Sequence, residues 1–306
     1  MMDALERVTG PANATPGAAS SAIAPVLAGP PQPVRVLAAF PAAVYLEHAT
    51  GLLAVVAADG VQHPNAVVLS VGVAARPLAG LHVGQEGTVG DGAIGVGQLQ
   101  VTVARWFDPS PHLRATSPPL IAGKIADARA HLMARTGSDS HDLAVPADAV
   151  AEALRSGDMD GVLTAVRDLV GAGPGLTPAG DDVLAGLFAA VVTLSPAVAP
   201  EATTTLTRTL ALTGGAVVDR ARHVTTAVSA ELLHHAVRGE VADLAAAVLH
   251  AFTGRRPLTP ALDALLAVGA TSGRDLAHGL ITGAALVLAT AEAGDPDRPA
   301  TTVGAR

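Results

Sequence analysis

The amino-acid sequence predicts an α+β protein in which an N-terminal antiparallel β domain is followed by a mainly α-helical domain. Its length of 306 residues suits two domains or one large one. Short β-type runs separated by turn residues fill the first third of the chain. After Asp108-Pro109-Ser110-Pro111, the apolar residues recur with helical spacing. Half of the residues are hydrophobic but only 2% are aromatic, so the core must be built mainly from Ala, Val and Leu.

The β domain is predicted from runs of four to six residues rich in Val and Leu. A Gly-dense stretch lies between the last two of them, at 84–97. Several short strands with turn signals between them are typical of a sandwich or a partial barrel. The runs are residues 34–37, 43–48, 52–56, 66–71 and 99–103.

The helical domain is predicted from Ala- and Leu-rich segments with apolar residues every three or four positions. Their small side chains would let helices cross closely. The expected helices are residues 121–135, 147–155, 159–170, 181–194, 202–212, 225–238, 241–252, 261–268 and 275–291.

These patterns divide the chain into four parts. Residues 1–30 are rich in Ala, Pro, Ser and Gly without a clear period, and we expect a flexible N-terminal tail there. The β-rich domain then covers 31–115, and the helical domain covers 116–292. Residues 293–306 are expected to form a flexible C-terminal tail.

The composition argues against several classes of protein. A net charge of −8 and few aromatic residues are unlike a nucleic-acid binder. The absence of cysteine removes disulfides, thiolate nucleophiles and Cys-based metal sites. Lys124 is the single lysine, and no Walker motif surrounds it. Without a His-Glu-x-x-His motif or a His-x-x-x-His pair, we expect no metal and no cofactor.

Membrane insertion and export are not favoured either. The uncharged stretch 183–200 has the bare length of a span, but Ser195, Pro196 and Pro200 interrupt it. The N-terminus carries Asp3 and Glu6 instead of a basic region, so it does not look like a signal peptide. We expect a cytoplasmic protein.

The most distinctive segment is Gly-Ala-Gly-Pro-Gly-Leu-Thr-Pro-Ala-Gly-Asp-Asp-Val-Leu-Ala-Gly, residues 171–186. A structural interpretation makes Thr177 the N-cap of a helix, with Asp181 and Asp182 favourable to its dipole. That interpretation leaves Gly180 and the dense glycines before it unexplained. Glycines let backbone amides approach a ligand closely, and a helix N-terminus favours anions. We therefore expect Gly173, Gly175 and Gly180 to bind a small anion.

A second copy of the pattern Gly-x-Asp-x-x-x-Gly strengthens this interpretation. Gly180, Asp182 and Gly186 form the first copy, and residues 273–279 form the second, with Asp275 as its carboxylate. Both copies lead into apolar helices, so two helix N-termini and two carboxylates could surround one pocket. Chance repetition of a device for starting helices is the alternative.

A third segment, Thr225-Thr226-Ala-Val-Ser229, begins another helix. Thr225 or Thr226 can cap that helix. The Ser229 hydroxyl either bonds a carbonyl one turn earlier or lines a pocket.

On these residues the chain resembles a bacterial family of formerly unknown function that includes the oxamate carbamoyltransferase subunit AllH. The resemblance is most specific at residues 173–186, and extends to Thr225-Thr226-x-x-Ser229 and Thr271-Ser272-Gly273-x-Asp275. Weaker matches at 43–46 and 63–64 bring its extent to most of 34–290. Family members often carry Ser where this sequence has Ala179.

The resemblance implies a component of an enzyme that splits oxalurate with phosphate into oxamate and carbamoyl phosphate, in anaerobic allantoin degradation. It also implies partner subunits, one of them similar to nucleoside-diphosphate-forming acyl-CoA synthetases.

Together these arguments give a hypothetical site for small anionic substrates. Asp182, Asp275 and Ser229 are its candidate catalytic residues, the two carboxylates orienting the carbamoyl amine or acting as base. Substrate would be bound by Gly173, Gly175, Thr177, Gly180, Asp181, Thr225, Thr226, Ser272, Gly273 and Arg274.

Two other functions remain open. One is a non-catalytic scaffold or regulatory subunit that binds an anion. The other is a hydrolase of small amides that uses Ser229 or Ser272.

Overall fold

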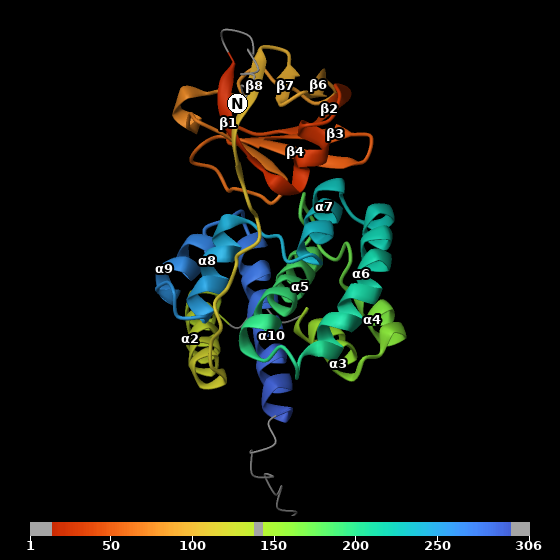
Figure 1. Cartoon of the computed structure of the whole chain (residues 1–306), viewed down its shortest axis with the longest axis vertical. Coiled ribbons are helices and arrows are strands. Elements are labelled where there is room, and N and C mark those ends of the chain that lie inside the picture. Colours follow the sequence, from red (N-terminus) through yellow and green to blue (C-terminus); the bar gives the residue numbers. More distant parts are fainter. Residues whose placement is uncertain (1–13, 138–142, 295–306) are drawn as a thin grey trace, which may run out of the picture. The chain divides into compact units, whose positions relative to one another are not determined.

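The structure is a computed structural model that describes residues 14–137 and 143–294. It divides into two compact units, Met1–Pro109 and Ser110–Arg306. Within the described residues the first unit is a β-barrel and the second is helical, so the mixed α and β composition expected from the sequence is present (Figure 1).

The first unit is a closed barrel with the strand order β1-β5-β4-β3-β2-β6-β7-β8. Its core is made by alternate residues of successive strands, for example Val34 and Val36 of β2 and Leu53 and Val55 of β4. The strands are β1 (Thr15–Ser20), β2 (Gln32–Ala39), β3 (Ala43–His48), β4 (Gly51–Val56), β5 (Ala66–Leu69), β6 (Glu86–Gly90), β7 (Ala93–Val96) and β8 (Leu99–Phe107), with the short helix α1 (Ala24–Leu27) after β1.

The expectation of an antiparallel domain is wrong for two of the strand pairs. β4 pairs with β5 in parallel, and β1 pairs with β8 in parallel. Residues 57–65 join β4 to β5 in place of a tight hairpin turn, which allows the parallel pairing. β1 and β8 come from opposite ends of the unit's sequence, and their pairing closes the barrel.

The expectation of a flexible tail over residues 1–30 is wrong from Thr15 onward, because β1 and α1 lie there. β1 consists of small residues with low strand propensity, so it resembles a loop in sequence. Its register requires that smallness: a Cβ on Gly17 would lie 2.7 Å from Cγ1 of Val67 on β5. Residues 1–13 and 295–306, where the rest of the expected tails falls, lie outside the described residues.

The second unit packs its helices around α5 and α10, which lie in the middle of the unit with α2, α8 and α9 on one side and α3, α4 and α6 on the other (Figure 1). The helices are α2 (Pro118–Thr136), α3 (Ala144–Ser156), α4 (Met159–Ala165), α5 (Ala179–Val198), α6 (Thr204–Val224), α7 (Ala227–Ala236), α8 (Asp243–Phe252), α9 (Leu258–Leu266) and α10 (Ser272–Ala293).

α6 is longer than the sequence pattern suggests. The expected helix ends at Leu212, before the pair Gly214-Gly215, but α6 continues to Val224. Gly214 is buried against α7, and a Cβ there would lie 3.3 Å from Cβ of Val237. Packing between the two helices therefore outweighs the low helix propensity of glycine.

α5 and α10 touch through glycine. A Cβ on Gly186 would lie 2.3 Å from the carbonyl oxygen of Leu276, and one on Gly279 would lie 2.0 Å from that of Val183. Each glycine thus faces the carbonyl three residues before the other glycine. The two copies of Gly-x-Asp-x-x-x-Gly therefore pack reciprocally, and any side chain at either glycine would separate the helices.

In the described part of the chain, α5 and α10 are also the helices long and apolar enough to span a membrane. The most apolar part of α5 is 78% buried within the protein, as expected for a core helix. These two helices therefore give no clear indication of a membrane protein.

The glycine contact predicts a large loss of stability for Gly279→Ala. The added Cβ overlaps the backbone of α5, and overpacking of this kind costs about 1–3 kcal/mol or more. Gly215→Ala is the matched control: it lies in α6 with nothing within 4 Å of its Cβ, so it should stabilise by up to about 1 kcal/mol. Thermal unfolding followed by circular dichroism measures both. Equal effects of the two variants would contradict the reciprocal packing.

Candidate active site at the N-termini of α5 and α10

Three segments that lie far apart in the sequence meet at the N-terminus of α5. The Thr177 hydroxyl lies 2.7 Å from that of Ser272, at the start of α10. The Thr226 hydroxyl, at the start of α7, donates to the carbonyl oxygen of Leu176 at 2.6 Å. These bonds tie the loop before α5 to both other helices.

The loop from Gly171 to Pro178 uses its glycines for backbone conformation. Gly171, Gly173 and Gly175 have φ values of +77°, +110° and +103°, a region that favours glycine. Gly173 and Gly175 are exposed, so their backbones are accessible to a ligand. The dense glycines of the motif thus have a conformational reason in addition to any role in binding.

Gly180 has a packing reason. A Cβ there would lie 2.0 Å from the carbonyl oxygen of Leu169, and the Gly180 amide donates to the carbonyl of Ala172 at 2.9 Å. Gly273 at the start of α10 is packed in the same way, since a Cβ there would lie 1.9 Å from the carbonyl oxygen of Leu265. Both glycines allow close contact of a helix start with the segment that precedes it, and the Gly180 amide is already hydrogen bonded.

Asp182 and Asp275 occupy equivalent positions on the two crossing helices. Each lies four residues before the glycine of the crossing, on the same face of its helix and about 6 Å nearer the N-terminus. Their exposed fractions are 7% and 6%. The Oδ2 atom of each is buried without a hydrogen-bond partner.

The pKa of Asp182 is raised to about 8, chiefly because its carboxyl group is buried. Hydrogen bonds from Ser272 and Thr177 lower this pKa, whereas the negative charges of Asp275 and Asp181 raise it. At neutral pH Asp182 is therefore mainly protonated, so it can donate a hydrogen bond.

Arg274 contacts Asp275, one member of this pair. Its Nε donates to Oδ1 of Asp275 at 3.0 Å, and its side chain is 31% exposed. A guanidinium suits an ionised carboxylate, so Asp275 and Asp182 differ in their partners although they are equivalent in position.

Asp181 is engaged within the protein. Its Oδ1 accepts from the Gly171 amide at 2.9 Å, and its Oδ2 accepts from the hydroxyl of Thr225. Burial raises the pKa of Asp181, while the hydrogen bonds from Thr225 and Gly171 lower it. Asp181 thus connects the glycine loop to the start of α7.

The helix caps differ in part from the sequence interpretation. Thr226 caps α7, accepting from the Ser229 amide at 3.1 Å, as one reading of that segment expected. Thr177 does not cap α5: Pro178 is the N-cap residue, with no side-chain bond, and the Thr177 hydroxyl faces α10 instead. Ser229 is 1% exposed, and its Oγ is buried without a hydrogen-bond partner beside Asp181.

Sequence reasoning missed a charged cluster at the other end of α7. His235 is 3% exposed, and its Nδ1 lies 2.5 Å from Oε2 of Glu240, while Glu231 lies one turn before it. Burial lowers the pKa of His235, but the bonds to both carboxylates raise it more. The i, i+4 spacing of Glu231 and His235 is the signal that could have found this cluster.

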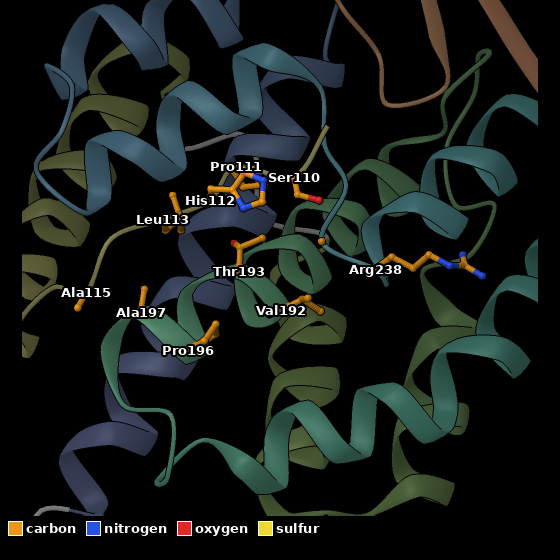
Figure 2. Close-up of a pocket in the computed structure, with 11 residues that line it drawn as sticks. Ser110, Pro111, His112, Leu113, Ala115, Val192, Thr193, Pro196, Ala197 and Arg238 are labelled. Atoms are coloured by element: carbon orange, nitrogen blue, oxygen red, sulfur yellow. The ribbon is translucent and has the colours of Figure 1, made fainter. Parts of the chain in front are cut away.

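A pocket of about 330 Å³ lies elsewhere in the helical unit and includes none of the expected site residues. It is lined by Val192 and Thr193 of α5, His112 and Arg238 among others. Val192 is ten residues, or about 15 Å, along α5 from Asp182. Figure 2 shows the Arg238 guanidinium directed away from His112, and Arg238 donates to the carbonyl oxygen of His234 at 2.5 Å.

No candidate metal-binding site occurs in residues 14–137 and 143–294. Within those ranges, no group of three or more His, Cys, Asp or Glu side chains is arranged to hold a metal ion.

The raised pKa of Asp182 predicts a pH-dependent effect of Asp182→Asn on stability. The folded protein keeps a proton on Asp182 between the ordinary pKa of 3.8 and about 8, and the unfolded chain has released it. The stability of the wild-type protein therefore falls as pH rises through that window. The Asp182→Asn variant has no titratable group at that position, so its stability does not fall for this reason. The Tm of the variant relative to wild type should rise by on the order of 10 °C between about pH 5 and about pH 8.5.

Thermal unfolding at both pH values measures this difference. Asp160→Asn, at an exposed position in the first turn of α4, is the control and should show no such growth. A pH-independent effect of Asp182→Asn would show that Asp182 is ionised throughout.

A comparison with known protein families identifies the same region. A family model described as oxamate carbamoyltransferase subunit AllH matches residues 169–284, which include the glycine loop, α5 to α9 and the first half of α10. No solved structure matches the chain. The resemblance seen at the motif is thereby confirmed over residues 169–284, where the chain matches the AllH family.

Proposed function

We propose that this chain is a subunit of a carbamoyltransferase that converts oxalurate and phosphate into oxamate and carbamoyl phosphate. The observation that carries the proposal is that the region matched by the family model is also the region in which the three helix starts meet. The family match begins at residue 169, directly before the glycine loop, and contains both buried carboxylates and the three helix starts that meet there.

The reaction needs donors and acceptors more than it needs a nucleophile from the protein. A phosphate oxygen attacks the terminal ureido carbon of oxalurate, and the bond from that carbon to the oxamate nitrogen breaks. The proton of the attacking phosphate ends on the leaving nitrogen. Negative charge develops on the carbamoyl oxygen in the transition state, and a donor placed there accelerates the reaction about 10²–10³-fold.

The site supplies such groups. The buried carboxyl groups of Asp182 and Asp275 have oxygens available to hydrogen bond a substrate. The exposed backbone of Gly173 and Gly175, next to the positive end of the α5 dipole, suits a carboxylate or phosphate. Thr177 and Ser272 connect the two parts of the site through their hydroxyl pair.

Partner subunits follow from the family and from the charge of the site. The family model describes a subunit of a carbamoyltransferase, which implies other subunits. Two carboxylates lie at the centre of the site, with Arg274 on one of them, which is a poor place for a dianionic phosphate. We therefore place much of the phosphate-binding surface on a partner, and the complex in the cytoplasm.

One observation favours a non-catalytic scaffold as a second candidate function. The amides of Gly171 and Gly180 and both oxygens of Asp181 bond within the protein, as they would in a purely structural junction. A hydrolase has less support, because the Ser229 hydroxyl has no hydrogen-bond partner and the Ser272 hydroxyl bonds Thr177.

Carbamoyl phosphate formation from oxalurate and phosphate, measured with and without the partner subunits, tests the proposal. We expect turnover only in the complex. Asp182→Ala and Asp275→Ala should lower kcat about 10²-fold or more in an intact complex, because each removes a group that contacts the carbamoyl end.

Asp160→Ala in α4 is the matched control and should leave kcat unchanged. Normal turnover in complexes that contain either site variant would favour the scaffold. Turnover by the isolated chain without phosphate would favour the hydrolase.

A further inference from the structure

The two unpartnered carboxyl oxygens are the most informative atoms in the helical unit. Oδ2 of Asp182 and Oδ2 of Asp275 are each buried without a hydrogen-bond partner, on side chains more than nine-tenths buried. Buried polar atoms in folded proteins almost always have partners, because an unmet one costs about 1–3 kcal/mol. Two such atoms at equivalent positions on touching helices indicate places that a ligand fills.

The chemical character of the two oxygens differs. Burial and, to a lesser extent, the nearby negative charge of Asp275 raise the pKa of Asp182 to about 8. Arg274 donates to Asp275, so Asp275 offers the acceptor of a charge-assisted hydrogen bond. Asp182, beside the hydroxyls of Thr177 and Ser272, then carries the proton.

One carboxylic acid and one carboxylate present one hydrogen-bond donor and one strong acceptor. A neutral carboxamide or carbamoyl group, with its C=O and N–H₂, is complementary to that pair. A carboxylate brings only acceptors and a charge of the same sign as Asp275. A divalent cation would require both aspartates to ionise.

We propose that Asp182 and Asp275 together recognise the neutral H₂N–C=O end of the substrate, Asp182 donating to its oxygen and Asp275 accepting from its nitrogen. This inference rests on the proposed function and adds to it the orientation of the substrate. The carbamoyl end lies against the two aspartates, one turn from the helix contact toward the N-termini, and the anionic end faces the exposed Gly173–Gly175 backbone. The buried pair thus selects for an uncharged amide and against a second carboxylate.

Three small isosteres test the selection by calorimetric titration of the full chain. Oxamate carries a carboxamide and a carboxylate, oxalate replaces the amide by a second carboxylate, and pyruvate replaces it by an acyl group without N–H donors. We expect oxamate to bind at least about tenfold more tightly than either of the others, the size of about one good hydrogen bond to a charged group. Equal affinities, or no binding of oxamate, would overturn the proposal.

Two variants separate this role from others. Asp182→Asn keeps a donor, so it should bind oxamate within about threefold of wild type. The weakening of wild-type binding above about pH 8 should disappear in it. Asp275→Asn removes the charge that repels oxalate, so the ratio of oxamate to oxalate affinity should fall toward one. Loss of oxamate binding in Asp182→Asn would show that Asp182 acts as a carboxylate.

Titration with Mg²⁺ alone addresses the cation alternative. Stabilisation by Mg²⁺ that disappears in Asp182→Asn would overturn the proposal in favour of a metal site. If Asp275→Asn does not fold, the proposal is still tested by the affinities of the wild-type protein for oxamate, oxalate and pyruvate and by the Asp182→Asn variant. The two proposals also fail separately: selective oxamate binding without carbamoyl transfer by the complex refutes the proposed function alone, whereas turnover without that selectivity refutes this inference alone.

Discussion

The backbone contact between α5 and α10 is the constraint on which the rest of the helical unit depends. Because Gly186 and Gly279 lack side chains, each helix presses a bare backbone against a carbonyl of the other. That proximity brings Asp182 and Asp275, one turn away, into a place from which water is largely excluded. Burial then raises the pKa of Asp182, while Arg274 donates a hydrogen bond to Asp275. Packing, electrostatics and candidate chemistry therefore have a common origin in two glycines.

The coarse fold could be predicted from the sequence, because it depends on local periodicity. Short apolar runs between turn residues marked β2 to β4, and helical spacing marked α5 and α10. The parts that could not be predicted depend on contacts between distant residues. β1 is a strand of small residues whose pairing with β5 and β8 closes the barrel, and nothing in residues 15–20 alone indicates it. The glycine pair in α6 resembles a helix end in sequence, because its contact with the end of α7 joins residues that are distant in the sequence.

The candidate site shows the same division between local and distant information. The repeat of Gly-x-Asp-x-x-x-Gly was visible in the sequence, and the structure brings its two copies together. The sequence could not separate glycines needed for conformation or packing from glycines available to a ligand. Gly171 and Gly180 have their amides bonded internally, whereas Gly173 and Gly175 are exposed. Asp181 and Asp182 are neighbours in the sequence, so the sequence could not distinguish their roles. Asp181 accepts hydrogen bonds from the glycine loop and from Thr225, whereas Oδ2 of Asp182 has no hydrogen-bond partner.

The central claim is that the buried pair on the crossing helices holds the uncharged end of the substrate. A crystal structure of the protein with oxamate bound tests it most directly. We expect the carboxamide nitrogen at hydrogen-bond distance from Oδ2 of Asp275, its oxygen at that distance from Oδ2 of Asp182, and the carboxylate toward Gly173 and Gly175. Oxamate bound with its carboxylate against the two aspartates, or bound away from them altogether, would contradict it.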